Sequence, residues 1–147
     1  MPRIAGPWSS TEIEHHLDTS VIPMRLAFKA GAWPVVVSLW YLHRDGALWC
    51  AMHETSRACR RLEQDPRCAF EVASDGVPYR GVRGRGRATL DPGAGGALLR
   101  ELLLRYLGSD TTEFGRWLLG RGGVEYAVRI VPSTLASWDY TSRMSAG

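Results

Sequence analysis

The sequence has little lysine, little cysteine and no long apolar run. Lys29 is the only lysine, so arginine supplies all the other residues among the 18 Lys and Arg, which outnumber the 15 Asp and Glu. This excess of three positive charges is too small to require a nucleic-acid partner. Apolar stretches such as Val35–Leu42 fall far short of the roughly 20 residues of a spanning helix, which argues against a membrane protein.

The three cysteines, Cys50, Cys59 and Cys68, form no close pair, which argues against a disulfide framework. No apolar leader follows Arg3, so we expect no export signal and a cytoplasmic location. Cys50 and His53 have the spacing of metal ligands, but no second pair accompanies them, and we expect no metal. The G-x-S-x-G elbow of many serine hydrolases is also absent. What is present, 45% hydrophobic and 22% charged residues, is typical of one globular domain over residues 1–147.

Hydrophobic patterns predict six strands, at Val21–Lys29, Pro34–Leu42, Ala47–Met52, Cys68–Ala73, Tyr79–Leu90 and Val124–Val131. A capping box at Ser9 and Glu12 starts a first helix, and a second is expected from Thr55 or Ser56 to Gln64. Two more are expected over Leu98–Leu107 and Glu113–Leu119. Neighbouring strands joined by hairpins favour a small antiparallel barrel. The expected fold is therefore mainly β with peripheral helices, an α+β class.

The strand Pro34–Leu42 is apolar on both faces and rich in β-branched and aromatic residues, which predicts burial on both sides. The turn at Asp45-Gly46 makes Ala47–Met52 its hairpin partner. One face of Pro34–Leu42 can point into the barrel, whereas the other needs a cover. A second copy of the chain would provide that cover, so we expect a homodimer.

Two segments are candidates for binding anions. The helix that begins at Ser56 has free N–H groups at its start, and the Ser56 hydroxyl, Arg57 and Arg60 suit a phosphate. An ordinary capped helix with surface arginines is the alternative. In the strand over residues 81–88, Arg83, Arg85 and Arg87 share one face, and small residues share the other. The arginine face would hold a phosphorylated or carboxylated substrate or, equally, be a solvated surface.

The order of these motifs resembles the pyridoxamine 5′-phosphate oxidase-like family, the FMN-binding split-barrel superfamily. The segments that carry the resemblance are Pro34–Tyr41, Asp45-Gly46, Ser56-Arg57, Leu62–Arg67, Arg80–Ala88 and the late Pro132, Trp138 and Arg143. Together they cover nearly the whole chain. The resemblance implies a six-stranded antiparallel split β-barrel, homodimeric, with two FMN sites at the subunit interface.

The resemblance also implies which residues form the site. FMN would lie along Val36, Val37, Ser38, Leu39 and Trp40, with the main chain of Ala51 and Met52 beside its ring or ribityl chain. Its phosphate would meet Ser56 and Arg57, with Arg57 or Arg60 replacing a lysine that many members have where this chain has Ala58. Trp138 would pack near the flavin, and Tyr79 or Arg83 would orient a small-molecule substrate.

The resemblance leaves three functions open. The first is an FMN-dependent oxidoreductase of unassigned substrate, in which the flavin performs the redox chemistry. The second is a reductase that uses the deazaflavin coenzyme F-420, whose longer acidic tail suits Ala58 and the arginine-rich strand. The third is a non-enzymatic flavin- or haem-binding protein.

Overall fold

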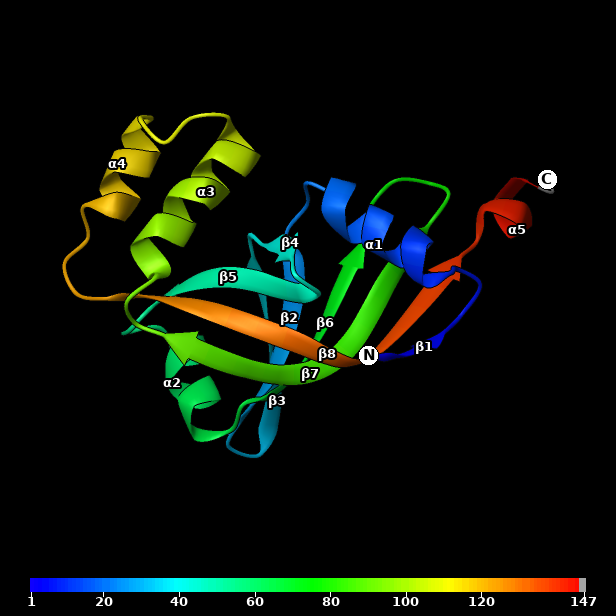
Figure 1. Ribbon diagram of the computed structural model, residues 1–147, viewed down its shortest axis with the longest axis horizontal. Helices are drawn as coiled ribbons and strands as arrows, with labels where there is room; N and C mark the ends of the chain where they lie inside the picture. Colours follow the sequence, from blue (N-terminus) through cyan, green and yellow to red (C-terminus); the bar gives the residue numbers. More distant parts are fainter. Residues whose placement is uncertain (146–147) are drawn as a thin grey trace.

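Residues 1–145 are described by a computed structural model, in which five helices surround one eight-stranded sheet (Figure 1). The strands are β1 (Arg3–Ala5), β2 (Met24–Ala30), β3 (Trp33–Leu39), β4 (Leu42–Arg44), β5 (Ala47–His53), β6 (Arg67–Ala73), β7 (Arg80–Asp91) and β8 (Glu125–Asp139). The helices are α1 (Ser10–Thr19), α2 (Arg57–Gln64), α3 (Gly95–Leu107), α4 (Glu113–Leu119) and α5 (Thr141–Ser145). The expected mainly β class with peripheral helices is confirmed. The count of six strands is wrong, because β1 and β4 are too short to show a hydrophobic pattern.

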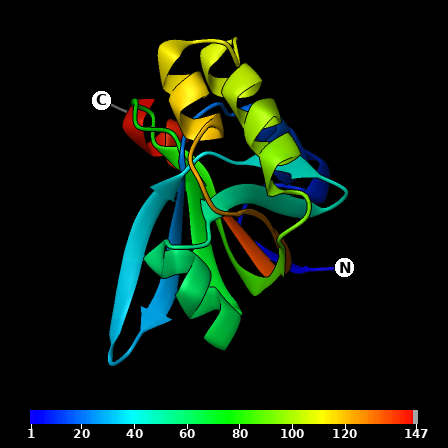
Figure 2. The same ribbon diagram turned by 90° about the vertical axis from the view of Figure 1, so that its left-hand side faces the viewer.

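The sheet is antiparallel, in the order β3-β2-β6-β7-β8-β5-β4, and β1 pairs in parallel with the end of β8. The two ends of this order, β3 and β4, are consecutive in the chain. The chain therefore passes from one edge of the sheet to the other over Trp40 and Tyr41. This passage brings the two edges near each other, and the curled sheet forms a barrel that is open along one side (Figure 2).

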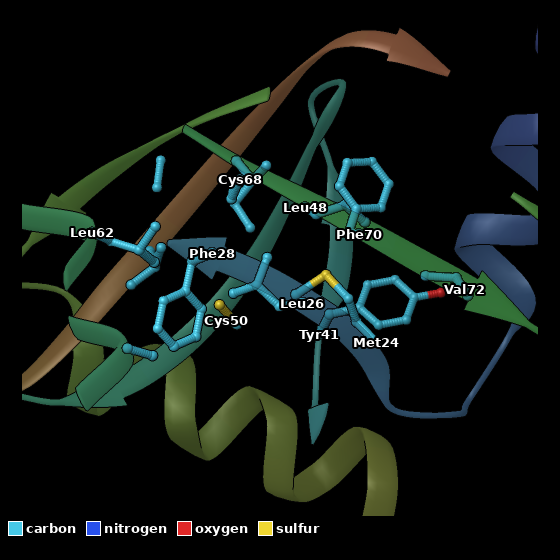
Figure 3. Packing of buried hydrophobic residues seen from close by; sticks show 14 of the residues in the cluster. Met24, Leu26, Phe28, Tyr41, Leu48, Cys50, Leu62, Cys68, Phe70 and Val72 are labelled. Carbon is cyan, nitrogen blue, oxygen red and sulfur yellow. The ribbon is translucent and has the colours of Figure 1, made fainter. Parts of the chain in front are cut away.

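The inward side chains of the barrel form one apolar core (Figure 3). On β2, Met24, Leu26 and Phe28 are buried and alternate with more exposed residues, as expected of a strand with one face toward the core. Helices α1 and α2 lie at opposite ends of the barrel in Figure 1 and add apolar side chains to it. The other large members of the core include Ile13, Leu17, Leu48, Cys50, Cys59, Leu62, Phe70, Val72, Val82, Val128 and Ile130.

Strand β3 differs most from the sequence prediction. The strand expected over Pro34–Leu42 ends at Leu39 and lies at an edge, where, within residues 1–145, it pairs with β2 alone. Val35 packs against the core, whereas Val36 is 65% exposed. Within residues 1–145 the outward face of β3 has no covering element, so its burial stays a prediction that depends on a second copy of the chain.

The predicted hairpin between Pro34–Leu42 and Ala47–Met52 is also wrong. The turn at Asp45-Gly46 joins β5 to the three-residue strand β4 only, while β3 lies across the open side. Since β3 and β4 are nearly contiguous in the sequence, their combined apolar run does not reveal where the chain leaves one edge for the other.

Strand β8 runs through Pro132 to Asp139, although the sequence predicted an end at Val131. Proline lacks a backbone donor, so a regular ladder would end there. The register shift between Arg85 and Gly86 of β7 accommodates it, since a bulge tolerates a missing ladder bond. This continuation brings the C-terminal segment into the sheet beside β7.

A second apolar cluster lies outside the barrel, where α3 packs against β5 and β8. Leu98 and Leu102 of α3 meet Leu42 and Ala127, with Trp40, Trp49 and Tyr106 at the margin. Helix α4 packs on α3, so the two form a hairpin on one side of the barrel (Figures 1 and 2). Within residues 1–145, no helix combines the length and apolar character that crossing a membrane requires.

Candidate cofactor and substrate site

The open side of the barrel leaves two strand edges without a neighbour. β3 pairs with β2 alone, and β5 beyond Trp49 pairs with β8 alone, among the strands of the described region. Alternate backbone N–H and C=O groups along both edges are therefore available to a ligand. The predicted flavin residues occupy these edges: Val36, Val37, Ser38 and Leu39 on β3, and Ala51 and Met52 on β5. Met52 and Val37 direct their side chains toward the core, so only their backbones face the gap.

Helix α2 starts four residues after β5 ends, as the sequence predicted. Ser56 is its N-cap, and the Ser56 hydroxyl oxygen accepts the N–H of Cys59 at 3.2 Å. The hydroxyl hydrogen remains a donor. Arg57 and Arg60 are exposed, and no acidic residue lies in the first turn. The helix start therefore presents donors and positive charge, which is what an anion requires.

The approach to α2 is held by His53. Its Nδ1 accepts the N–H of Thr55 at 3.2 Å, so the proton sits on Nε2, which donates to the carbonyl of Gly122 at 2.6 Å. Glu54 adds a second hydrogen bond between these segments, because its Oε1 accepts the N–H of Val124 at 3.2 Å. These bonds attach the segment before β8 to the segment before α2.

A cavity of about 610 Å³ lies on the outer face of the sheet, over β2, β3, β6, β7 and β8. Small or apolar side chains form much of its floor, because Val36 is paired with Ala27, and Ala27 with Ala69. One row along the strands, Arg25 is paired with Glu71, and Glu71 with Arg83. The cavity thus combines an apolar floor with a charged row, and it includes the predicted residues Val36 and Arg83.

The structure brings Arg83 and Trp138 together. The guanidinium carbon of Arg83 lies 5.4 Å from the centre of the Trp138 ring, a cation–π distance. The strand predicted from the sequence ends before Trp138, and only the continuation of β8 sets Trp138 on the face that carries Arg83. Tyr79 lies before β7 and is 43% exposed, and its N–H donates to Sδ of Met144 at 3.3 Å.

Most of the predicted residues therefore fall into three groups: the two strand edges, the start of α2, and the outer sheet face with Arg83 and Trp138. Trp40, in the passage from β3 to β4, and Tyr79, before β7, lie outside these groups. Strand β3 belongs to two of them, since its free edge borders the gap and its Val36 side chain lines the cavity. Figure 2 shows α2 close to the hairpin of β2 and β3, so the first two groups lie near each other.

Sequence reasoning missed Tyr106. Its hydroxyl accepts the N–H of Tyr41 at 3.1 Å and donates to the carbonyl of Ile22 at 2.8 Å. Its ring stacks on Trp40, with centroids 5.2 Å apart and an angle of 11°. Tyr106 therefore fixes the passage from β3 to β4. A tyrosine in an amphipathic helix carries no sequence signal for this task.

The three cysteines do not supply a nucleophile. Burial raises the pKa of Cys50 to about 12, and the pKa values of Cys59 and Cys68 to about 11. All three thiols are therefore protonated at neutral pH and act as small apolar groups.

The sequence matches no family model and no curated protein. Solved structures do match. A conserved hypothetical protein of Mycobacterium tuberculosis has a TM-score of 0.76 and 26% identity, over 95% of this chain and 90% of that chain. An F420 reductase has a TM-score of 0.70 and 20% identity, over 88% of this chain and 97% of that chain. A pyridoxamine 5′-phosphate oxidase candidate of Listeria innocua has a TM-score of 0.66 and 15% identity, over 86% of this chain and 95% of that chain.

Further matches include FAD-binding proteins and a haem storage protein of Vibrio cholerae. The neighbours thus include pyridoxamine 5′-phosphate oxidase-like proteins, flavin-binding proteins and an F420 reductase, and the chain has their split-barrel fold. The resemblance drawn from the order of the motifs is confirmed at this level. Because oxidases, reductases and a storage protein share this fold, activity has to be argued from the site.

Proposed function

We propose that this protein is an FMN-dependent oxidoreductase that holds the flavin in the gap between β3 and β5, with its phosphate at the start of α2. The observation that carries the proposal is the combination of two free strand edges with a helix start that bears Ser56 and Arg57. When bound, FMN supplies hydride and electron transfer, and the protein supplies binding and orientation.

The residues at the start of α2 fit a phosphate. The Ser56 hydroxyl and the first N–H groups of the helix donate hydrogen bonds, and the Arg57 guanidinium adds a charge-assisted contact. Ala58 is only 6% exposed, so the position where many family members have lysine is turned into the core. The positive charge therefore comes from Arg57 or, one turn along, from Arg60.

The residues along the strand edges fit a flat polar ring. The free backbone groups of β3 and β5 are held in register by their other neighbours, so they are oriented before a ligand arrives. Apolar side chains such as Val36 limit water on one side. Arg83 and Tyr79 are the residues we assign to orienting a substrate, and Trp138 packs near the flavin.

We also propose that a second copy covers the outward face of β3 and completes the flavin site, as a homodimer. The support is the exposure of Trp33, at 77%, and of Val36, at 65%, on one edge strand. Exposed apolar edge strands are a hazard unless another chain covers them. Light scattering during size-exclusion chromatography would give a mass of two chains, and Val36→Glu would shift it toward one.

The test of the cofactor site is FMN titration of the protein and of the double variant Ser56→Ala/Arg57→Ala, followed by flavin fluorescence. Loss of a charge-assisted bond and a hydroxyl donor is expected to weaken FMN binding by about 10- to 100-fold. Arg100→Ala is the matched control, because it removes an exposed guanidinium from α3. Unchanged FMN affinity in the double variant would exclude this phosphate site.

A deazaflavin-dependent reductase is the second candidate, and a specific feature favours it. Beside the first cavity, a second cavity of about 460 Å³ is lined by Arg67, Arg85 and Arg87, and Arg85 borders both. This basic groove suits the longer acidic tail of coenzyme F-420. Arg85→Ala/Arg87→Ala would weaken F-420 binding and leave FMN binding unchanged. Tight binding of FMN or haem with no turnover would instead indicate the non-enzymatic alternative.

A further inference from the structure

The cavity of about 610 Å³ on the outer face of the sheet has an apolar strip across its floor. The apolar strip consists of Val36 on β3, Ala27 on β2 and Ala69 on β6, which the strand pairing sets side by side. Arg85 on β7 is paired with Ala69, so it stands at one end of the apolar strip. Neighbouring strands lie about 4.8 Å apart, so about 14 Å separates Arg85 from Val36. The apolar strip therefore has a cation at one end and the proposed flavin strand at the other.

The charged side chains that line this cavity are mostly positive. They are Arg25, Arg83, Arg85 and Glu71, and within residues 1–145 none of them forms an ion pair within 4 Å. Arg83 and Arg85 are two residues apart on β7 and point to the same face, so together they can hold one anionic group. The ring of Trp138 holds the Arg83 guanidinium in place at 5.4 Å. Glu71 opposes a second negative charge on the ligand, which favours a carboxylate over a phosphate dianion.

A second copy of the chain does not by itself balance this positive charge. In a two-fold symmetric contact the same surface patch lies on both copies, so the excess of arginine on one copy would face an identical excess on the other. Like charges brought together in this way repel each other. A second copy over β3 would therefore close the cavity from outside, whereas the unpaired arginines inside it require an anion.

We propose that this cavity binds the substrate and that the substrate is an elongated apolar compound with one carboxylate group. The carboxylate lies between Arg83 and Arg85, and the apolar body lies on the apolar strip with its far end at Val36. The inference rests on the proposed function, because it brings the far end of the substrate to the flavin strand. An uncharged compound would leave the two arginines unpaired, and a short carboxylate would not reach β3.

The first experiment needs no cofactor. The probe is biphenyl-4-carboxylate; biphenyl-4-carboxamide lacks its charge, and benzoate lacks its second ring. Each compound is titrated into ¹⁵N-labelled protein, and the indole N–H signal of Trp138, assigned by Trp138→Phe, is followed because Arg83 lies over that ring. We expect biphenyl-4-carboxylate to shift this signal saturably. We expect the other two to bind about tenfold more weakly, or less, because each loses either the charged contacts or half of the apolar contact.

Four single variants test the charges. Arg83→Gln and Arg85→Gln should each weaken the binding of biphenyl-4-carboxylate about tenfold, because each removes charge-assisted hydrogen bonds. Glu71→Gln should strengthen it about two- to threefold, because a negative charge about 7 Å from the carboxylate is removed. Arg87→Gln is the matched control: Arg87 is on the same face of β7 but lines the other cavity, so affinity should not change. All four side chains are exposed, and circular dichroism should match the parent.

Equal affinity of the parent, Arg83→Gln and Arg85→Gln for biphenyl-4-carboxylate would overturn the inference. So would tighter binding of biphenyl-4-yl phosphate, or a fall in molecular mass from two chains to one when the probe is added, because a second copy would then occupy the cavity. The proposed function fails separately: if FMN does not bind but the probe binds with the expected pattern, only the flavin assignment is lost. If FMN binds and the probe does not, only the substrate inference is excluded.

Discussion

Replacing Tyr106 by phenylalanine tests whether one hydroxyl group holds the passage between β3 and β4. That hydroxyl accepts the N–H of Tyr41 at 3.1 Å and donates to the carbonyl of Ile22 at 2.8 Å. Phenylalanine keeps the stacking on Trp40 but leaves both backbone groups without this partner. A partly buried unsatisfied group costs about 1–3 kcal/mol, so we expect the free energy of unfolding to fall by about 2 kcal/mol. For a chain of this size the midpoint temperature Tm would fall by about 4–8 °C.

Two measurements check this result. Urea unfolding followed by tryptophan fluorescence gives the free energy, and NMR-detected hydrogen exchange gives the protection of the Tyr41 amide. The control is Tyr79→Phe, because Tyr79 is exposed and lies outside the apolar clusters. We expect faster exchange at Tyr41 only in Tyr106→Phe. If that amide stays equally protected in both variants, and both unfold at the same urea concentration, the passage is held by something other than this hydroxyl.

Three further predictions concern Gly84, His16 and the three cysteines. In Gly84→Ala the new Cβ would lie 2.6 Å from Cζ of Phe70. Calorimetry should therefore show that the free energy of unfolding falls by about 1–3 kcal/mol. Gly76→Ala, which has nothing within 4 Å, should show little. Burial lowers the pKa of His16, so the unfolded chain takes up a proton first as the pH falls below about 6.5. The contribution of His16 to stability is therefore fully present above that pH and declines below it. Between pH 7.5 and 5.5 the Tm of His16→Gln should fall less than the Tm of the parent. An equal fall in Tm would show that His16 is not the source of the pH dependence. Iodoacetamide at pH 8 should label none of the cysteines in the folded protein and all three in urea, as mass spectrometry would show, because their burial raises the thiol pKa values.

The sequence by itself determined the elements whose ends carry local chemistry. Ser9 and Glu12 form the predicted capping box, Ser56 caps α2, and Gln64 ends it. α4 spans the predicted Glu113–Leu119. Such ends depend on a side chain bonding to backbone only a few residues away, so neighbours in the sequence suffice to predict them. The order of these motifs also led to the split-barrel fold.

Only the tertiary structure decided which strands share an edge. The single apolar run predicted over Pro34–Leu42 is divided between β3 and β4, which lie on opposite sides of the gap. The bulge that carries β8 past Pro132 sets Trp138 beside Arg83. Both outcomes depend on pairing between residues far apart in the chain, and hydrophobic periodicity reports which face of a strand is apolar but not which strand lies beside it. The gap and the outer cavity both arise from that pairing.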